Sequence, residues 1–335
     1  MPLVEFHHAL HDWYLEHGRH DLPWRKTEDA YAIWVSEVML QQTQVSTVLN
    51  RFYHPFLKEF SSLHSLAKAN LQEVLQLWQG LGYYSRARNL HSAAQAMSAA
   101  GLNTLPSDPA ELIKLSGIGK NTANAIAAFA FHQPVAILEA NVKRVVARIF
   151  ALETPTDKEL WNHAEQLLNP SNPFDYNQAM MDLGSLICTP KAPQCDQCPA
   201  ATICEGKASP KRYPQKKVKK KIPTRKRNIF LLKDSQNRYA IRVRETRFLH
   251  GLWEFPEAEQ EESIYHFSKT DYKIDNNNFI GYISHIYSHF KLAANIYEFT
   301  AKSGSADWQW KTATEIARLP LSRTEKKILA LLAKQ

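Results

Sequence analysis

A basic stretch of 21 residues divides this chain into two parts of different character. The stretch, residues 207–227, contains eleven lysines and arginines, three prolines and no acidic residue. Like charges repel one another and proline restricts the backbone, so this composition is typical of an extended linker. A chain of 335 residues is long enough for about two domains. We therefore expect two folded parts, 1–206 and 228–335, joined by a basic linker.

The net charge of +8 comes entirely from that linker. Residues 1–206 carry 15 basic and 20 acidic residues, a net charge of −5, and residues 228–335 carry 15 basic and 13 acidic residues, a net charge of +2. The linker adds the remaining +11. These charges either keep a tether solvated or also lie along nucleic-acid phosphates, where counterion release strengthens binding. The two interpretations are compatible, and we predict that the solvated linker also crosses a nucleic-acid backbone.

The rest of the sequence excludes several classes of protein. No apolar run approaches the roughly 18 residues that a membrane-spanning helix needs. The N-terminus mixes His, Asp, Glu and Arg with apolar residues, which excludes a secretory signal peptide. Four cysteines are too few for a disulfide framework in a chain of this length, so we expect a cytoplasmic protein with metal ligands or free thiols.

Apolar residues follow a helical period in the first part and a strand-like pattern in the second. Spacings of three and four residues predict helices within 6–15, 33–52, 63–77, 90–99 and 123–129. After the linker, strand-like runs lie at 228–232, 239–244, 279–286 and 292–299. A last helix fits residues 323–332. We thus predict a multidomain chain with an all-helical first domain and a separate α+β domain.

All four cysteines fall within 17 residues, as Cys188-x6-Cys195-x2-Cys198-x5-Cys204. Four thiolates in one loop can bind a tetrahedral zinc ion or hold a cubane iron–sulfur cluster. Zinc sites usually show two close pairs, whereas here only Cys195 and Cys198 form one, which favours the cluster modestly. The spacing alone leaves both possibilities open.

Residues 115–126, LSGIGKNTANAI, join two predicted helices by a glycine-rich turn. Gly117 and Gly119 permit a tight turn whose backbone N–H groups face outward at a helix N-terminus, where an anion such as phosphate can bind. With Lys120 and Thr122 after them, the turn resembles a helix–hairpin–helix, which contacts a DNA backbone without reading its sequence.

Two acidic residues stand in otherwise apolar surroundings. Glu37 lies in the helical segment 34–45, and Glu139 ends the apolar run 135–138. A carboxyl group in such a place either pairs with a partner or is kept for chemistry with a raised pKa. Two carboxyl groups at one cleft suit cleavage of a glycosidic bond, with one protonating the leaving group and one facing the cationic sugar.

Taken together, these features resemble the MutY-type adenine DNA glycosylases of the helix–hairpin–helix superfamily, over nearly the whole chain. The resemblance is carried by the hairpin, the four cysteines and the segments LPWR (22–25), SEVMLQQTQV (36–45), LWQGLGYYSRARNL (77–90) and YNQAMMDLG (176–184). It implies a monomeric repair enzyme that removes adenine mispaired with 8-oxoguanine or guanine in double-stranded DNA. It also implies that the cysteines, Cys188, Cys195, Cys198 and Cys204, hold a 4Fe–4S cluster.

The resemblance also implies roles for individual residues. Glu37 matches the general acid that protonates the departing adenine, and protonation matters because an adenine anion is a poor leaving group. The adenine must first leave the base stack, because its glycosidic bond is unreachable inside a duplex. Residues that match the adenine pocket are Trp24, Arg25 and Gln178, and residues that match the duplex wedge are Gln42, Leu81 and Tyr83.

Two further positions concern the type of reaction. Asn121 stands where the related endonuclease III branch has the lysine of its Schiff-base lyase activity, so the resemblance implies a monofunctional glycosylase. The family's Asp-Gly-Asn is Glu139-Ala140-Asn141 in this chain. Glutamate keeps the charge that stabilises the sugar cation or bonds to it transiently, but it adds about 1.3 Å of reach, and a misplacement of roughly 1 Å can cost about 100-fold in rate. We predict that Glu139 keeps the catalytic role, with Asn141 beside it.

Two segments of the last part resemble the family's C-terminal Nudix-like domain, which senses 8-oxoguanine. They are GLWEFP, at Gly251–Pro256, and the triplet Tyr287-Ser288-His289. An aromatic ring can stack on a base while Ser and His supply short-range hydrogen bonds. The glutamate spacing of the Nudix hydrolases is missing, so we expect this domain to bind and not to hydrolyse.

Two other functions stay open. One is an endonuclease III-like glycosylase with lyase activity, against which Asn121 and the long second domain count. The other is a lesion-binding protein that has lost turnover because glutamate replaces the family's aspartate at position 139.

Overall fold

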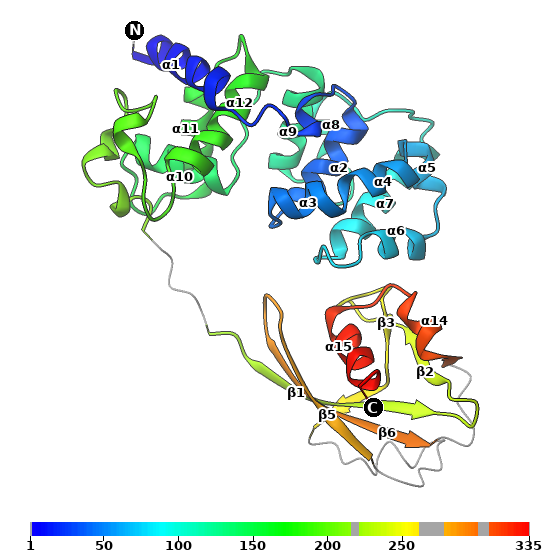
Figure 1. Ribbon diagram of the computed structural model, residues 1–335. Helices are drawn as coiled ribbons and strands as arrows, with labels where there is room; N and C mark the ends of the chain where they lie inside the picture. Colours follow the sequence, from blue (N-terminus) through cyan, green and yellow to red (C-terminus); the bar gives the residue numbers. More distant parts are fainter. Residues whose placement is uncertain (1, 216–220, 261–277, 301–307, 335) are drawn as a thin grey trace. The chain divides into compact units, whose positions relative to one another are not determined.

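The computed structural model describes residues 2–215, 221–260, 278–300 and 308–334 (Figure 1). Contacts between residues divide the chain into two units. The first contains residues 1–68 and 89–218, and the second contains residues 69–88 and 219–335. Residues 69–88, from the middle of the helical part, therefore group with the C-terminal part. Residues 216–220 of the predicted linker lie outside the described residues, and the predicted domain limits remain a prediction.

The first unit is built from helices. They are α1 (Pro2–His17), α2 (Ala30–Leu40), α3 (Val45–Arg51), α4 (Tyr53–Glu59), α5 (Leu63–Lys68), α7 (Ser85–Ala99, of which residues 85–88 belong to the second unit), α8 (Pro109–Leu112), α9 (Lys120–Phe131), α10 (Ala140–Ile149), α11 (Asp157–Leu167) and α12 (Pro173–Asp182), which a π-helix at Leu183–Ile187 extends. Local side chains fix several helix starts. The Asp29 side chain accepts a hydrogen bond from the Tyr31 N–H at the start of α2, and Thr156 and Glu159 form a capping box on α11.

Two of the apolar cores among the described residues connect helices of this unit. Phe6, Leu10 and Tyr14 recur once per turn on α1 and pack with buried residues of α10, α11 and α12. Figure 1 shows α1 beside α12, so that the start of the chain lies against a helix that ends near residue 182. In the second core, Ile33 of α2 packs on Ala125 and Phe129 of α9. This packing brings α2 close to the helix that follows the glycine-rich turn.

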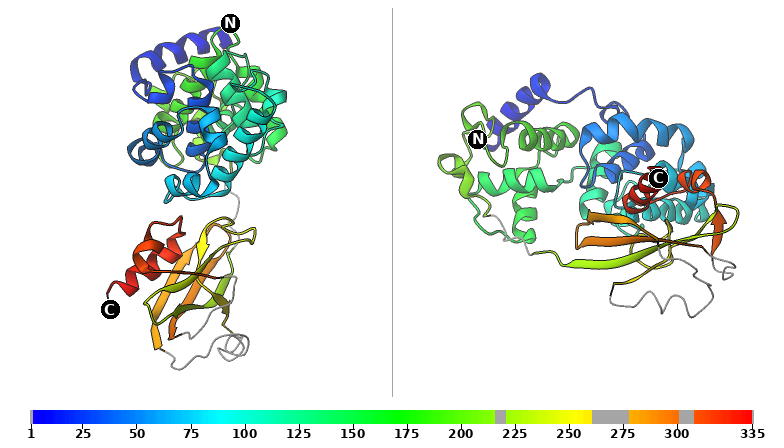
Figure 2. Two further views of the ribbon diagram at one scale, coloured as in Figure 1. Left: turned by 90° about the vertical axis from the view of Figure 1, so that its right-hand side faces the viewer. Right: turned by 60° about the horizontal axis from the view of Figure 1, so that its bottom comes forward.

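The second unit is a mixed β-sheet with helices. Its elements are α6 (Leu71–Leu77), β1 (Thr224–Lys233), β2 (Tyr239–Val243), β3 (Trp253–Glu254), β4 (Glu257–Glu259), β5 (Asn278–Ile286), β6 (Lys291–Thr300), β7 (Gln309–Lys311), α14 (Ala313–Ala317) and α15 (Arg323–Leu332). The strand order is β3-β2-β1-β6-β5, with β4 paired to β1 and β7 paired to β2. β1 and β6 are parallel and the other pairs are antiparallel. The C-terminal helices, red in Figure 2, cover one face of the sheet, where Ile316 and Ile328 join Ile229 and Leu231 in one core.

The main differences from the predicted elements are helix breaks. The run predicted as helical at 33–52 is interrupted at Gln41–Gln44, where Gln42 takes a left-handed φ of 56°. The run at 63–77 breaks before Asn70, whose side chain caps α6. Strand β1 starts at Thr224, inside the stretch predicted as linker. Among the described residues, no helix is both long and apolar enough to cross a membrane.

Candidate active site

Glu37 is the only charged residue of α2, and the helix is buried on nearly all sides. Its side chain keeps some exposure, as a group that must meet a substrate needs. Burial and, to a smaller extent, the nearby Glu139 carboxylate together raise the pKa of Glu37 to about 8, although Arg25 opposes both effects. Glu37 therefore carries a proton at neutral pH and can act as an acid.

Glu139 is the residue before α10 and adopts an extended backbone, with φ −83° and ψ 177°. Its side chain does not cap the helix. The amide of Asn141 instead donates a hydrogen bond of 3.4 Å to the Glu139 Oε1 atom. Burial raises the pKa of Glu139, whereas this hydrogen bond and the charges of Arg19, Arg144 and Arg25 lower it. The two acidic residues predicted from the sequence thus lie within electrostatic reach of one another in the same unit.

Three asparagines fix the segment that leads into Glu139. The Asn121 Oδ1 atom accepts a hydrogen bond from the Leu138 N–H at 2.7 Å, and Asn124 donates to the Ala136 carbonyl at 2.7 Å. From α12, the Asn177 Oδ1 atom accepts from the Ile137 N–H at 2.9 Å. The position of the Glu139 backbone is therefore set from α9 and α12, and Asn121, predicted as a catalytic residue, supports this segment.

Asp182 binds Arg25, a residue of the predicted adenine pocket, and our sequence analysis did not identify Asp182. This fully buried carboxylate accepts hydrogen bonds from Arg25 at 2.7 and 2.9 Å and from the Nε atom of Arg19 at 2.7 Å. Burial would raise the pKa of Asp182, but the hydrogen bonds and charges of both arginines outweigh it and lower the pKa. The sequence feature that could have identified Asp182 is the presence of an aspartate within the apolar segment 176–184.

Two polar atoms of this region are buried without a hydrogen-bond partner in the described structure. They are the Nε atom of Arg25 and the Oε1 atom of Gln178, which lies one turn before Asp182 on α12. Trp24 is buried and packs edge-on against Tyr53, with ring centroids 5.1 Å apart. A buried donor and acceptor without partners cost free energy. A ligand with hydrogen-bonding edges can remove that cost.

The four predicted metal ligands, Cys188, Cys195, Cys198 and Cys204, line one small pocket. Burial raises the pKa of the Cys198 thiol to about 11. The guanidinium of Arg148 donates to the Cys188 Sγ atom at 3.2 Å and offsets part of the negative charge that ligating thiolates would bring. Four thiols around one pocket with a guanidinium beside them have the chemistry of a four-thiolate site, although their positions in this structure do not form a ligand group. No three His, Cys, Asp or Glu side chains in the described ranges are grouped to hold one metal ion.

Arg144 connects the cysteine loop to the acidic residues. Its Nε atom donates to the Cys188 carbonyl at 2.8 Å, and its Nη2 atom donates to the Asn141 Oδ1 atom at 3.0 Å. Asn141 in turn donates to Glu139. A shift of the cysteine loop would reach Glu139 through these two side chains.

The predicted hairpin precedes α9 as a tight turn. Gly117 has a left-handed φ of 78°, and a Cβ atom there would lie 2.6 Å from the Asn89 side chain. Gly119 caps α9 and leaves the first N–H groups of the helix without a side-chain cap. Lys120 is paired with Glu165 at 3.2 Å, and the buried Thr122 hydroxyl accepts from Gln41 at 3.2 Å. The glycines therefore offer the open N–H groups, while Lys120 and Thr122 already have partners within the protein.

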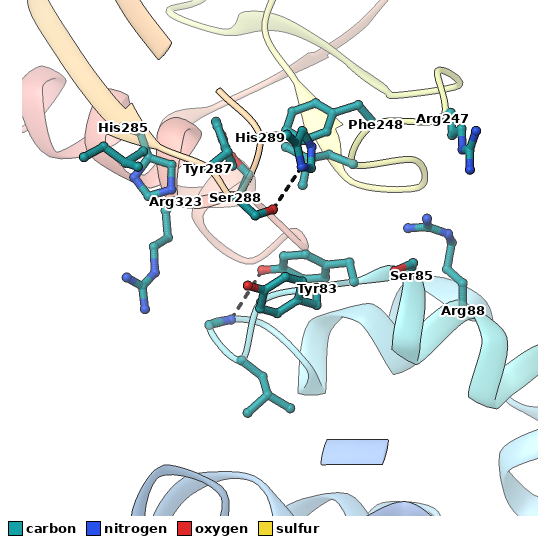
Figure 3. Close-up of a pocket in the computed structure, with 17 residues that line it drawn as sticks. Tyr83, Ser85, Arg88, Arg247, Phe248, His285, Tyr287, Ser288, His289 and Arg323 are labelled. Atoms are coloured by element: carbon teal, nitrogen blue, oxygen red, sulfur yellow. Dashed lines mark hydrogen bonds between the residues drawn. The ribbon is translucent and has the colours of Figure 1, made fainter. Parts of the chain in front are cut away.

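A groove of about 740 Å³ lies in the second unit and contains most of the predicted duplex-contacting residues (Figure 3). Its walls include Leu81, Tyr83 and the triplet Tyr287-Ser288-His289. Tyr83 is 45% exposed with a strained φ of 48°, whereas Leu81 is buried. The Tyr287 hydroxyl is 2.6 Å from the Thr324 Oγ1 atom, so this ring is anchored to α15. Gln42 belongs to the first unit and is exposed.

Hydrogen bonds attach the loop that carries Tyr83 to the turn before α15. Gln79 donates to the Leu319 carbonyl at 3.0 Å, and the Tyr84 hydroxyl donates to the Leu321 carbonyl at 3.2 Å. On the preceding helix α6, Gln72 accepts from the Trp253 indole at 2.9 Å. These contacts explain why residues 69–88 group with the C-terminal residues.

Comparisons with known proteins agree with this architecture. Residues 35–170 match the family described as HhH-GPD superfamily base excision DNA repair protein, and residues 228–331 match the NUDIX domain family. The adenine DNA glycosylase of Buchnera aphidicola subsp. Baizongia pistaciae (strain Bp) is 34% identical over 305 residues, which cover 88% of this chain and 86% of the relative. The human adenine DNA glycosylase is 43% identical over 219 residues, covering 61% of this chain and 40% of the relative.

A solved structure of a thermostable thymine-DNA glycosylase superposes with a TM-score of 0.57 at 26% identity, covering 62% of this chain and 97% of that one. These similarities confirm the predicted fold class, and they do not favour either of the two alternative functions considered above. The chain belongs to the adenine DNA glycosylases, enzymes of base-excision repair that cleave the N-glycosidic bond of DNA.

Proposed function

We propose that this enzyme removes adenine paired with 8-oxoguanine or guanine, by drawing the adenine out of the duplex and protonating it. The observation that carries the proposal is the pair of acidic residues, a protonated Glu37 within the field of Glu139. Their surroundings support adenine as the leaving base, because the Arg25 Nε atom and the Gln178 Oε1 atom are a buried donor and acceptor without partners. An adenine edge presents both an acceptor and a donor.

The mechanism assigns the two carboxyl groups different tasks. Glu37 gives its proton to the departing adenine, so that the base leaves without a negative charge. Glu139 faces the sugar as a carboxylate and stabilises the positive charge that develops there, or bonds to it transiently, before water completes the hydrolysis. The Asn121, Asn124 and Asn177 side chains hold the backbone before Glu139, and Asn141 orients its carboxylate.

The nearby amines support a monofunctional glycosylase. Asn121 has no amine with which to attack the sugar. Lys120 is paired with Glu165 at 3.2 Å, and Lys143 is paired with Asp157 at 2.7 Å. A lysine held as an ammonium ion in an ion pair is a poor nucleophile. We therefore infer that strand scission requires a separate step after adenine leaves.

We further propose that the four cysteines hold a 4Fe–4S cluster. If bound by these four thiolates, such a cluster would cross-link the loop. Arg148 and Arg144 bind the Cys188 carbonyl at 3.1 and 2.8 Å and so attach that loop to α10. Because α10 begins directly after Glu139, an ordered cysteine loop helps to hold Glu139 in place, although no cysteine belongs to the acidic pair.

A single-turnover assay tests the proposed function. Excess enzyme is mixed with a duplex that contains adenine opposite 8-oxoguanine, and samples are analysed with and without alkali. We expect cleavage only after alkali, because alkali breaks the strand at the site that lost its base. Enzyme-dependent nicking at oxidised pyrimidines would support the lyase alternative, and tight binding without excision would support the lesion-binding alternative.

The excision rate should depend on pH through Glu37. Because the pKa of Glu37 is raised to about 8, its acid form is populated below that pH and is lost as the pH rises above it. We expect the single-turnover rate to fall about tenfold per pH unit above about pH 8. A rate that stays constant to pH 10 on the same duplex would contradict this assignment.

The Gln79 contact should affect discrimination between mispairs. Gln79→Glu keeps the size of the side chain but replaces the donor to the Leu319 carbonyl with a repelling oxygen, which should loosen the Tyr83 loop. We expect the preference for 8-oxoguanine over guanine opposite adenine to fall about 3- to 10-fold, because a change of that size corresponds to the net free energy of roughly one hydrogen bond. The matched control is Gln76→Glu on the exposed side of α6, which should leave the ratio of the two rates unchanged.

A further inference from the structure

The groove of the second unit has a lining of one charge sign. Among the described residues, it is lined by three arginines and two histidines, Arg88, Arg247, Arg323, His285 and His289, and by no acidic residue. The same walls carry aromatic rings, including Tyr83 and Tyr287. Burial lowers the pKa of His285, and the positive charges of Lys327 and Arg323 nearby lower it too. A groove with flat rings and uncompensated positive charge suits a strand of nucleic acid.

The three arginines differ in how they are held. Arg88 donates to the His250 carbonyl at 2.8 Å, so it also fastens a loop. Arg247 and Arg323 are exposed and form no ion pair within the part of the chain that the structure describes. Arg323 is moreover the first residue of α15, where the helix dipole disfavours a positive side chain and favours a bound anion. Both side chains are therefore free to bind an anion.

Figure 3 shows how these charges are distributed around the triplet. Arg323 lies with His285 on one side of Tyr287 and Ser288, and Arg247 lies with Arg88 on the other side. The Ser288 hydroxyl and the His289 Nδ1 atom, 3.0 Å apart, stand between them above Tyr83. Successive phosphates of a DNA strand flank each base in the same manner.

We propose that Arg323 and Arg247 are a phosphate clamp for the strand opposite the excised adenine, binding the phosphates on the two sides of the purine that is left unpaired. The inference rests on the proposed function, which supplies the unpaired purine. The ligand class is the sugar–phosphate backbone of that strand. Each arginine then contributes affinity without reading the base, while the triplet and Tyr83 meet the base itself.

Salt dependence of binding tests the clamp. The probe is a duplex with 2′-fluoroadenosine, whose glycosidic bond resists cleavage, opposite 8-oxoguanine. Arg247→Ala and Arg323→Ala should each weaken binding about 3- to 10-fold and reduce the slope of log K against log salt by roughly 0.7 to 0.9. Arg323→Lys should keep the slope, because it keeps the charge. Arg318→Ala, an exposed arginine of the same unit outside the groove, is the control and should change neither value.

Neutral methylphosphonates locate the contacts. One such linkage is placed at each phosphate flanking 8-oxoguanine, and in parallel at the phosphates flanking the adenine. If the clamp is correct, Arg323→Ala no longer weakens binding when one of the phosphates flanking 8-oxoguanine is replaced by the neutral linkage. In the same way, Arg247→Ala no longer weakens binding when the phosphate on the other side is replaced.

The proposal would be overturned if neutral linkages in the adenine strand, and not those flanking 8-oxoguanine, removed the effects of the two arginine substitutions on binding. It would also be overturned if Arg318→Ala weakened binding as much as the clamp variants do. An unchanged salt slope in variants whose thermal unfolding matches that of the parent would overturn it as well. Binding to the uncleavable duplex does not need excision, so failure of the clamp and failure of the proposed function are distinguishable.

Discussion

Glu37→Gln is expected to reduce single-turnover excision of adenine opposite 8-oxoguanine by about 100- to 10,000-fold, the range by which general acids accelerate reactions. Glutamine has the size of protonated glutamate but cannot give a proton to the leaving base. Burial and the Glu139 carboxylate raise the pKa of Glu37 to about 8, which favours the acid form at neutral pH. The measurement is the rate of alkali-labile site formation with enzyme in excess.

Two controls separate chemistry from folding and binding. Burial disfavours the charged form of Glu37, so Glu37→Gln should unfold at a temperature equal to or above that of the parent. Binding to the uncleavable duplex should change less than about threefold, because the amide still makes hydrogen bonds. Glu5→Gln, on the exposed side of α1, is the matched substitution and should excise at the parental rate. Excision by Glu37→Gln within tenfold of the parent would refute the role.

The candidate site residues that could be proposed from the sequence are those whose chemistry is unusual for their surroundings. Glu37 and Glu139 are carboxyl groups in apolar segments, the cysteines are clustered, and the glycines stand before a helix. Burying a carboxyl group or crowding several thiols together destabilises a fold, so such residues point to a functional site. A local sequence pattern is therefore enough to identify them. The division into helical and mixed parts follows equally from local periodicity.

What the sequence did not predict depends on contacts between distant residues. Asp182 meets Arg19 and Arg25 across more than 150 positions, and Asn177 meets Ile137 across 40. The grouping of residues 69–88 with the C-terminal sheet depends on Gln72, Gln79 and Tyr84, whose partners lie about 180 to 240 positions away. No periodicity marks such residues, because a glutamine on a helix surface has the same pattern whether it faces water or a carbonyl.

Glu139→Gln is the second substitution with a large expected effect. The amide cannot stabilise a sugar cation by charge or form an ester with it, so we expect excision to fall about 100- to 1,000-fold. The Asn141 amide would meet an uncharged oxygen in place of the Glu139 carboxylate. Folding should be little affected, because the Glu139 side chain does not cap α10 and its burial as an anion is costly. The rate is measured with enzyme in excess on the same duplex.

Glu139→Asp distinguishes a loss of charge from a loss of reach. The segment before residue 139 is held by Asn121 at 2.7 Å and by Asn177 at 2.9 Å, so the backbone has little freedom to move a shorter side chain toward the sugar. Removing one methylene also lengthens an Asn141 contact that is already 3.4 Å. We therefore expect Glu139→Asp to excise adenine about 10-fold more slowly than the parent, yet faster than Glu139→Gln. This loss is smaller than the roughly 100-fold loss that a misplacement of about 1 Å can cause.

If the glutamine variant excises adenine at the parental rate, another group must stabilise the sugar. If the parent itself binds tightly without excision and Glu139→Asp restores turnover, the glutamate has made this chain a binding protein. The order parent, aspartate, glutamine is the result that assigns the carboxylate of Glu139 to the sugar.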